Sequence, residues 1–332
     1  MQPLVSILIP AYNAGAWIAE TIQSAVRQTW PNKEIIIVDD GSSDGTLAIA
    51  RRLAAADVSV VSQPNQGAAA ARNHAYSLCH GDYVQWLDAD DLLAPDKIAV
   101  QMAAALAGGS PRTLFSAAWG QFYHRPQKAR FSPSPLWCSL PPAEWLLRKM
   151  EQNCFMQTAC WLVSRELCAA AGPWDQRLLG DDDGEYFCRV LSASDGVQFL
   201  PDSKVYYRDS GSGRLSRVGS SDRKMDAHFL SMQLHLRHLR TLAGGERARA
   251  AGLRYLQLSL IYFYPERMDI VAAAQASAAE LGGRLEPPRL ERKYSWLRPI
   301  VGWRATKRLR LAAQGWKRTA ARSADRLLAR LA

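Results

Sequence analysis

The feature that most constrains this chain is an apolar run that ends abruptly in carboxylates. Residues 83–87 are typical of a buried strand, and three acids follow it: Asp88, Asp90 and Asp91. Carboxylates two positions apart on extended backbone face the same side, so a bend here would aim Asp88 and Asp90 outward together. They repel each other unless a positive group lies between them, and a hard divalent cation that also holds a diphosphate meets that need. The alternative is a helix cap with solvated neighbours, because a helix is expected from Pro95 to Leu106.

Strand-like and helix-like segments alternate along the first part of the chain. Further strands are expected at residues 5–9, 34–38 and 58–61, and helices at residues 18–28, 44–53 and 68–78. This alternation with short connections predicts an α/β fold with a mostly parallel central sheet flanked by helices. Ligands of such sheets gather at the carboxyl ends of the strands. Tyr12, Asp40 and Asp88 all fall at those ends.

The rest of the chain divides into three stretches. Residues 111–200 lack a clear period and carry five tryptophans, for which packing in an aromatic core is favoured over lining an acceptor cleft: Trp119, Trp137, Trp145, Trp161 and Trp174. After a boundary near Val218 the composition is helical, with helices expected at residues 225–242, 248–264 and 270–281. The expected units are therefore an α/β domain over 1–218, a helical extension over 219–283 and a basic tail over 284–332.

The positive charge of the chain is concentrated in that tail. Residues 284–332 carry 14 Lys and Arg against three acids, whereas the remaining residues are close to neutral. Between Trp303 and Leu331 apolar residues recur every three or four positions, with arginines on the other faces. Such a helix suits an anionic membrane surface, which is the favoured interpretation. The alternative is a helix packed on the body or on a partner subunit.

Composition narrows the class of protein further. The chain of 332 residues, 48% of them hydrophobic, can bury a large core. Its N-terminus does not look like a signal peptide, and no apolar stretch reaches the roughly 18 residues that a membrane span needs. Its six cysteines show no C-x-x-C pair, which predicts reduced thiols rather than a metal site. A cytoplasmic protein is expected, and peripheral attachment to the inner face of the cytoplasmic membrane is compatible with the basic tail.

Several separated motifs occur in a recognisable order. They are Pro10-Ala-Tyr-Asn13, Gln28-Thr29, Glu34 to Thr46 (EIIIVDDGSSDGT), Gly67 with Ala71-Arg72-Asn73, Leu87 to Asp91 with Pro95, Gly172 to Leu178 (GPWDQRL), and Asp182-Asp-Gly-Glu185 with Arg189. With this ordered set the first 210 or so residues resemble an inverting family 2 glycosyltransferase of the GT-A fold, of the kind that builds bacterial cell-surface polysaccharides. The helical region after Val218 is not covered by the resemblance.

The resemblance implies a nucleotide-sugar site and a role for each matching residue. Tyr12 would pack against the base, Asp40 would accept a hydrogen bond from an imide N–H such as that of uracil, and Arg72 would lie beside the nucleotide. Asp88 would reach the ribose, and Asp90 would bind Mn²⁺ or Mg²⁺ bridging the diphosphate. The matching donor-binding positions are Pro10, Ala11, Tyr12, Asn13, Asp40, Arg72, Asp88 and Ala89. Alternatives are a core position for Tyr12, a helix cap for Asp40 and an ion pair for Arg72.

The family's general base is the second acid of a Glu-Asp-x-Asp pattern, which falls on Asp183, with Asp182 as the second choice. Three aspartates in a row raise one another's proton affinity, which favours a base, although a solvated acidic loop at a helix start is the alternative. Many relatives have a His after the last sheet element, but this chain has none there, so Arg208 or Arg214 is the candidate diphosphate ligand.

Two further patterns invite structural explanations. Glu185 and Arg189 stand four residues apart, which predicts an ion pair on one helix. His228, His235 and His238 share a helical face, for which a solvated surface is favoured over a zinc site.

The resulting hypothesis is transfer of a sugar from a nucleotide-diphosphate sugar, with UDP preferred, to a hydroxyl of a glycan or lipid-linked glycan. Asp183 would take the proton, and a single displacement would invert the anomeric centre. A nucleic-acid-binding protein that uses the basic tail is an alternative from another class, but the body lacks a basic stripe. A catalytically inactive scaffold and a sugar nucleotidyltransferase are further alternatives, and the latter lacks its Gly-rich phosphate loop. The donor sugar, the acceptor and the oligomeric state stay open.

Overall fold

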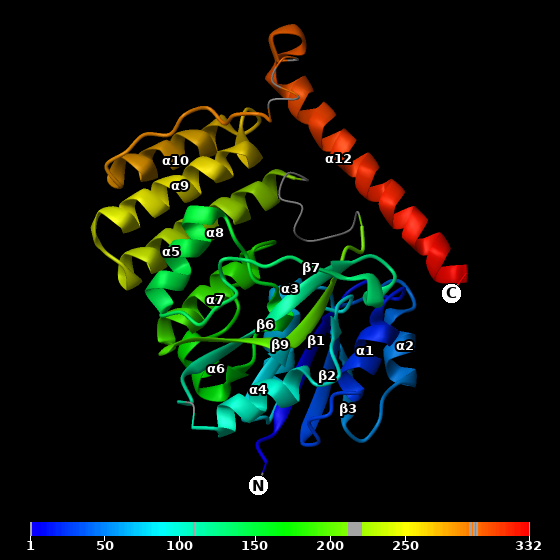
Figure 1. The fold of residues 1–332 in the computed structure, drawn as a ribbon. Coiled ribbons are helices and arrows are strands. Elements are labelled where there is room, and N and C mark those ends of the chain that lie inside the picture. Colours follow the sequence, from blue (N-terminus) through cyan, green and yellow to red (C-terminus); the bar gives the residue numbers. More distant parts are fainter. Residues whose placement is uncertain are drawn as a thin grey trace.

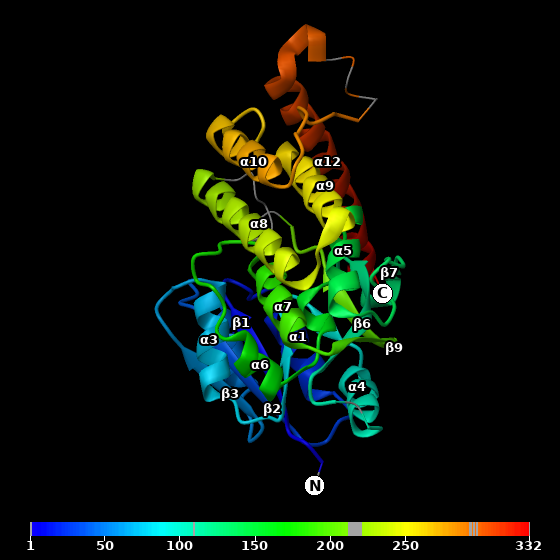
Figure 2. The ribbon, with the colours of Figure 1, turned by 90° about the vertical axis from the view of Figure 1, so that its left-hand side faces the viewer.

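The computed structural model describes residues 2–108, 110–211, 221–291, 294, 296 and 298–331. Two β-sheets with their covering helices form one part of the molecule, and a bundle of helices is stacked on them (Figures 1 and 2). The N-terminus lies at the edge of the sheets farthest from this bundle (Figure 1). The strands of the first sheet therefore point their carboxyl ends toward the helical region.

The first sheet has the predicted parallel core. Its strand order is β3-β2-β1-β4-β8, in which the first four strands are parallel and β8 is antiparallel. The strands are β1 (Val5–Ala11), β2 (Lys33–Asp39), β3 (Val58–Ser62), β4 (Tyr83–Trp86) and β8 (Val163–Ser164). Because β1 and β2 are buried on both faces, their sequences are continuous apolar runs rather than alternating ones. The connecting helices are α1 (Ile18–Val26), α2 (Thr46–Arg52) and α3 (Ala68–Leu78).

A second, mixed sheet occupies the stretch in which the sequence shows no clear period. Its order is β5-β9-β6-β7, with β6 and β9 parallel and a register shift between Ala117 and Ala118. The strands are β5 (Leu92–Leu93), β6 (Thr113–Phe122), β7 (Arg130–Phe131) and β9 (Gly196–Arg208). Sequence analysis missed this sheet because β6 is buried along most of its length, so its residues do not alternate. Three of the five tryptophans, Trp145, Trp161 and Trp174, are buried, as the core-packing interpretation predicts.

Helices of this middle stretch connect the two sheets to the bundle. They are α4 (Lys97–Leu106), α5 (Pro142–Gln152), α6 (Arg165–Ala171) and α7 (Asp182–Ala193), with 3₁₀ turns η1 (Pro126–Lys128) and η2 (Thr158–Cys160). All six cysteines are free thiols, as predicted.

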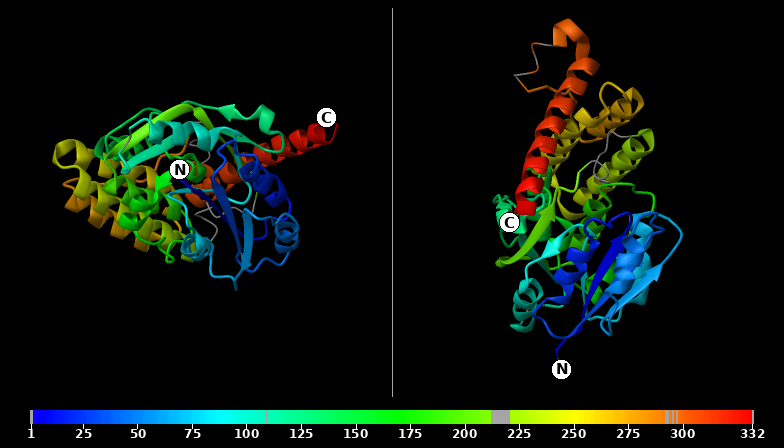
Figure 3. Two further views of the ribbon diagram at one scale, coloured as in Figure 1. Left: turned by 90° about the horizontal axis from the view of Figure 1, so that it is seen from below. Right: turned by 90° about the vertical axis from the view of Figure 1, so that its right-hand side faces the viewer.

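The C-terminal part is helical, as the composition indicates. It comprises α8 (Asp222–Leu242), α9 (Gly245–Phe263), α10 (Met268–Glu280) and α12 (Arg298–Leu331), which breaks at Gly302 with φ 76°. The apolar side of α8 packs toward α7, and α5 packs on α9. The boundary expected near Val218 lies outside the described residues. Figure 3 shows α12 running along the outside of the molecule, beside the bundle and the sheets.

Candidate active site

Arg72 joins two carboxylates that come from distant parts of the sequence. Its Nη2 donates to Asp88 Oδ1 at 2.7 Å, and its Nη1 donates to Asp182 Oδ2 at 2.6 Å. α3 carries Arg72, Asp88 follows β4, and Asp182 begins α7. The guanidinium also lies 4.4 Å from the centroid of the buried Trp174 ring. Burial disfavours its charge, but the two carboxylates outweigh burial and raise the pKa of Arg72.

Asp183 carries the least compensated negative charge of this cluster. Burial and the neighbouring carboxylates Asp182 and Asp181 raise the pKa of Asp183 to about 7. Its Oδ2 accepts a hydrogen bond from Thr158 Oγ1 at 3.1 Å, and its Oδ1 accepts one from its neighbour's amide, Gly184 N, at 2.9 Å. A carboxyl group that titrates near neutrality can take a proton at physiological pH.

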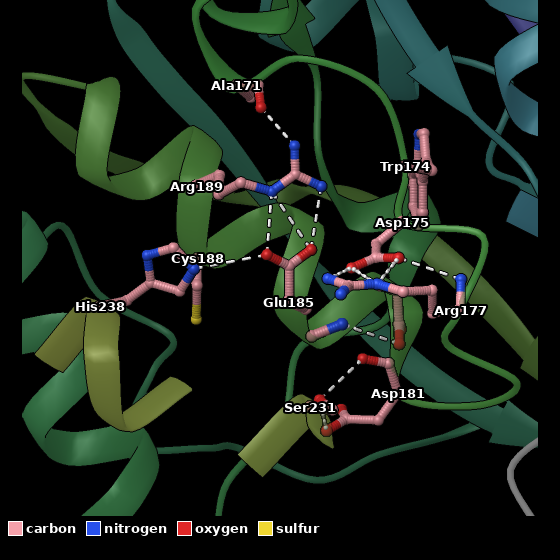
Figure 4. A network of polar contacts seen from close by, with 12 residues as sticks. Ala171, Trp174, Asp175, Arg177, Asp181, Glu185, Cys188, Arg189, Ser231 and His238 are labelled. Atoms are coloured by element: carbon pink, nitrogen blue, oxygen red, sulfur yellow. Dashed lines mark hydrogen bonds and ion pairs between the residues drawn. The ribbon is translucent and has the colours of Figure 1, made fainter. Parts of the chain in front are cut away.

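Asp181 fixes the turn that presents these acids. It adopts a left-handed conformation with φ 56°, which Asp and Asn tolerate better than most other residues with a side chain. Ser231 Oγ of α8 donates to Asp181 Oδ2 at 2.7 Å (Figure 4). His235 Nδ1 lies 3.7 Å from the same oxygen. Burial disfavours its charge, yet His235 and Lys149 help to lower the pKa of Asp181. α8 thus supports the start of α7 from behind.

Asp40 accepts three hydrogen bonds from neutral donors. Its Oδ1 accepts from Gln63 Nε2 at 2.8 Å and Gln66 N at 2.9 Å, and its Oδ2 accepts from Gly67 N at 2.8 Å. Gly67, with φ 94°, immediately precedes α3, so the same turn that holds Asp40 also aims Arg72. Asp40 caps neither helix: its partners lie in the loop before α3, and at the start of α2 it is Asp44 Oδ1 that accepts from Thr46 N at 2.9 Å.

The end of β1 lies beside Asp40 in the first sheet. Asp40 N donates to Ala11 O at 2.8 Å, and Pro10 and Ala11 are buried within the sheet. Tyr12 is not a core residue, since 54% of it is exposed. Asn13 has φ 48° and receives a hydrogen bond from Ser43 N at 2.9 Å. Ends of adjacent parallel strands lie about 4.8 Å apart, so Asp40 and Asp88, on either side of β1, are about 10 Å apart.

The three acids after β4 take different positions. Asp88 reaches Arg72, whereas Asp91 is fully buried and accepts hydrogen bonds from Arg208 N and Gln157 Nε2. Asp90 lies between them and is partly exposed. Ala89 is held by Thr21, whose Oγ1 donates to Ala89 O at 3.0 Å.

Arg208 lies behind the Asp90 turn rather than facing outward. Its side chain is fully buried; Nε donates to Asp90 O at 2.8 Å and Nη2 donates to Glu20 Oε2 at 2.7 Å. The guanidinium also lies 4.5 Å from the ring centroids of Trp17 and Phe122. In this arrangement the buried guanidinium of Arg208 supports the turn from inside the protein. Arg214, the other candidate, lies outside the described residues.

Comparison with known proteins identifies a family for part of this chain. The family model described as Glycosyl transferase family 2 matches residues 6–170, which include β1 to β4, Asp40, Arg72, Asp88 and Asp90. Through this segment the chain belongs to glycosyl transferase family 2. Asp182 and Asp183 lie beyond the matched segment, and the Arg72–Asp182 ion pair connects the start of α7 to it.

Curated relatives of this family 2 segment include synthases of polysaccharides. The chain is 46% identical over 98 residues to a chondroitin synthase of Escherichia coli, covering 29% of this chain and 14% of that protein. It is 44% identical over 98 residues to a hyaluronan synthase of Pasteurella multocida (29% and 10%), and 40% identical over 104 residues to an uncharacterized glycosyltransferase of Haemophilus influenzae (30% and 42%). The matched segment spans less than half the length of these relatives.

Solved structures of other proteins share the fold. Residues 1–349 of S. aureus TarS in complex with UDP-GlcNAc superpose with a TM-score of 0.63 at 17% identity, covering 83% of this chain and 81% of that one. The mannosyltransferase PcManGT from Pyrobaculum calidifontis, in complex with GDP-Man and Mn²⁺, gives 0.53 at 21% identity, covering 84% and 76%. The predicted GT-A fold is thereby confirmed.

The structure explains why two of the family 2 motifs occur together. Asn73 Nδ2 donates to Trp174 O at 2.9 Å, and Trp174 N donates to Asn73 Oδ1 at 2.8 Å. This pair of bonds fastens the Gly172-Pro-Trp174 turn to α3, next to Arg72. Sequence reasoning missed this clamp, and it also missed Thr158 and Gln63 as partners of the acids. No local signal marks a single Thr or Gln whose partner is distant in sequence.

The α8 histidines are not on a solvated face, so that expectation is wrong. His235 is fully buried with Nδ1 2.8 Å from Tyr255 Oη, and burial together with the Lys149 charge lowers its pKa to about 4. His238 Nε2 lies 3.4 Å from Glu185 Oε1, and the predicted Glu185–Arg189 pair is confirmed at 2.9 Å (Figure 4). Within the described parts of the chain, no three His, Cys, Asp or Glu residues are grouped to hold a metal ion. α8 turns this face inward because it packs on α7, which helical periodicity alone does not reveal.

Proposed function

We propose that this chain transfers a sugar from a nucleotide-diphosphate sugar, with UDP as the nucleotide, to a hydroxyl of a glycan or lipid-linked glycan. The observation that carries this proposal is the Asp88–Arg72–Asp182 bridge, which brings the carboxyl end of β4 to the start of α7. A candidate base, Asp183, thus lies beside a candidate donor site. The chondroitin and hyaluronan synthases among the relatives and the UDP-GlcNAc complex of TarS support this class of reaction.

The donor would lie across the carboxyl ends of β2, β1 and β4. The exposed ring of Tyr12 offers a flat apolar surface to a base. Asp40, held by three donors, is a fixed acceptor for an imide N–H. Asp88, already oriented by Arg72, would accept from ribose hydroxyls. Pro10, Ala11, Asn13 and Ala89 would contribute backbone shape around these side chains.

Asp90, with Asp88 two residues before it, fits a hard divalent ion such as Mn²⁺ or Mg²⁺. Such ions bind oxygen ligands, and Mg²⁺ commonly takes one or two carboxylates and completes its shell with water and substrate phosphates. Few protein ligands therefore suffice when a diphosphate supplies the others. Bound there, the ion would offset the negative charge that develops on the departing diphosphate. Arg208 would keep the Asp90 turn in place through its bond to Asp90 O.

Asp183 would act on the acceptor. The acceptor oxygen forms a bond to the anomeric carbon from the side opposite the diphosphate, the bond to the diphosphate breaks, and the hydroxyl proton passes to the Asp183 carboxylate. A single displacement of this kind inverts the anomeric centre. Thr158 Oγ1, hydrogen-bonded to Asp183 Oδ2, would keep the other oxygen turned toward the acceptor.

The place of action is part of the same proposal. No described helix is both long enough and apolar enough to cross a bilayer. We place the reaction in surface polysaccharide or glycolipid assembly, on the cytoplasmic side, with residues 284–332 at an anionic membrane surface.

A thermal-shift titration tests the donor site. The melting temperature should rise by several degrees with UDP or UDP-GlcNAc at saturating concentration, and further when Mn²⁺ is added. GDP-mannose serves as the competing nucleotide. Asp90→Asn should lose the Mn²⁺-dependent part of the shift, whereas Asp96→Asn, on the exposed start of α4, should keep it. Absence of any nucleotide-dependent shift in the wild type would contradict the proposal.

A further inference from the structure

The long helix α12 is anchored to the body at two widely separated points. Lys307 Nζ donates to Tyr264 O at 2.8 Å and to Glu266 Oε2 at 2.7 Å, at the end of α9. Asp325 Oδ1 accepts from Arg125 Nε at 2.7 Å, and its Oδ2 accepts from His124 N at 2.9 Å, in the loop after β6. One end of α12 is thus attached to the helical region and the other to the second sheet (Figures 1 and 3).

Both anchors lie on the same side of α12. Lys307 and Asp325 are separated by five turns of about 3.6 residues each, so their side chains point in the same direction. Thr306, next to the first anchor, is fully buried. Arg322 lies on the same part of the helix as Asp325, and a Cβ added at Gly211 would overlap its guanidinium. This polar side of α12 therefore faces the body, close to the loop that follows β9.

The opposite side of α12 is an exposed apolar stripe. Leu309 and Leu327 each follow an anchor by two residues, which turns them about 160° away from the body. Residues recurring every three or four positions extend this side along the helix; we call Ala305, Leu309, Ala312, Trp316, Ala320, Ala324, Leu327 and Leu331 the outer stripe. The exposed fractions are 50% for Leu309, 81% for Trp316, 60% for Leu327 and 77% for Leu331. A contiguous apolar surface of this length on a monomer indicates an interaction site.

The charge beside the outer stripe identifies its partner. Arg304 and Arg308 line a shallow hollow together with Ala305, Leu309 and Ala312 of the stripe. Lys317, Arg326 and Arg330 are exposed farther along. A second copy of this chain would bring an equally basic tail against the first, and the two would repel. An apolar stripe edged by cations instead matches the acyl and phosphate layers of an anionic bilayer.

We propose that the outer stripe inserts into the headgroup region of an anionic membrane while the opposite side of α12 stays bound to the body. The two alternatives for the basic tail, a membrane surface and the body of the protein, then apply to two sides of one helix. The bilayer would be held at a fixed orientation to the loops at residues 123–125 and 209–211. That α12 presents a lipid-linked acceptor to the active site rests on the proposed glycosyl transfer. The binding of α12 to the membrane does not rest on it.

Vesicle co-sedimentation of the full chain tests the stripe. Wild-type protein should bind vesicles of phosphatidylcholine mixed with phosphatidylglycerol and bind poorly to phosphatidylcholine alone. The double variant Leu309→Ser/Leu327→Ser should partition about 30-fold more weakly or worse, because two leucines no longer enter the bilayer. Its melting temperature and its donor-dependent thermal shift should equal those of the wild type.

Two other exposed leucines of α12 provide the control for the stripe variant. Leu311 and Leu328 are 54% and 47% exposed, but both lie away from the outer stripe. Leu311→Ser/Leu328→Ser should therefore bind vesicles within about twofold of the wild type.

Equal loss of vesicle binding in both double variants, or no loss in the stripe variant, would overturn the proposal. So would a stripe-dependent dimer in sedimentation velocity without lipid, or tighter binding to duplex DNA than to anionic vesicles. A stripe variant that keeps the donor-dependent shift but loses vesicle binding would support the membrane contact, whether or not sugar transfer is found.

Discussion

Asp40 and Asp183, two carboxylates of the proposed site, have opposite surroundings. Asp40 is surrounded by N–H donors, three of which point at its two oxygens. Asp183 has two donors, and its nearest charged neighbours include Asp182 and Asp181. Hydrogen bonds hold the first carboxylate in a fixed position, whereas the second is held where a negative charge is costly.

This difference in surroundings matches the two proposed roles, donor binding for Asp40 and proton transfer for Asp183. A carboxylate that must recognise an N–H benefits from rigidity and a permanent charge, which neutral donors provide. A carboxylate that must accept a proton needs a proton affinity close to the working pH, which burial and like charges provide. Arg72 keeps the second arrangement stable, because it neutralises Asp88 and Asp182 without bonding to Asp183.

The largest effect is expected when Asp183 loses its ability to take a proton. Asp183→Asn keeps the size of the side chain and the bond from Thr158 but cannot act as a base, so kcat should fall by about 10²- to 10⁴-fold. Binding of UDP should stay within about threefold of the wild type, because the nucleotide is expected near Asp40. Rates of UDP release and a nucleotide titration measure the two quantities.

A remote acid controls for this change. Asp195 lies beyond the other end of α7 with an exposed side chain, and Asp195→Asn should keep wild-type kcat. If Asp183→Asn turned over at the wild-type rate, Asp183 would not be the base, and Asp182→Asn would be the next variant to assay.

Much of the donor half could be predicted from the sequence because its signals are local. Each strand of the first sheet is an apolar run, and each candidate ligand directly follows one, so the position of Asp40 or Asp88 needs no tertiary information. The second sheet could not be predicted, since β6 is buried on both sides and shows neither alternation nor helical spacing. Its pairing with β9 joins segments about 80 residues apart, a contact that no local pattern specifies.

The partners of the acids were unpredictable for the same reason. Sequence indicates that Arg72 could meet an acid, but not that it meets Asp88 and Asp182 at once. The α8 histidines show helical spacing without showing which way the face turns, because that depends on packing against α7. The Asp181 turn depends on Ser231, fifty residues away.

A smaller effect is expected when Asp40 loses its charge. Asp40→Asn keeps one acceptor oxygen but turns an NH₂ group toward the donors of Gln63 or Gly67, so the side chain should lose its fixed orientation. We expect the Kd for UDP to rise about 10- to 100-fold, with kcat at saturating donor changed little. Isothermal titration measures the affinity. Asp57→Asn, exposed at the amino end of β3, is the control and should leave the Kd unchanged. An unchanged Kd in Asp40→Asn would remove the contrast between the two acids.

The smallest effect concerns stability, and its sign follows from the raised pKa of Asp183. The folded protein holds a proton on this carboxyl up to a pH of about 7, whereas the unfolded chain releases it near the ordinary value of 3.8. The folded state therefore binds more protons between these values, and the contribution of Asp183 to stability falls as the pH rises. Asn cannot ionise, so Asp183→Asn should be more stable than the wild type at pH 8 by about 1–2 kcal/mol, a value reduced by the partial exposure of the side chain. The gain should vanish near pH 4, which urea denaturation at the two pH values can measure.

Asp181 should show the opposite sign, because its pKa is lowered in the folded protein. Its carboxylate contributes stability above pH 3.8 that is lost as the pH falls, so Asp181→Asn should be less stable than the wild type at pH 8. The left-handed backbone at this position does not confound the comparison, since Asn tolerates that conformation. Two neighbouring substitutions of the same chemistry would then change stability in opposite directions. If both variants were less stable than the wild type at pH 8, burial and like charges would not set the proton affinity of Asp183. Asp183 and Asp40 would then differ only in their hydrogen bonds.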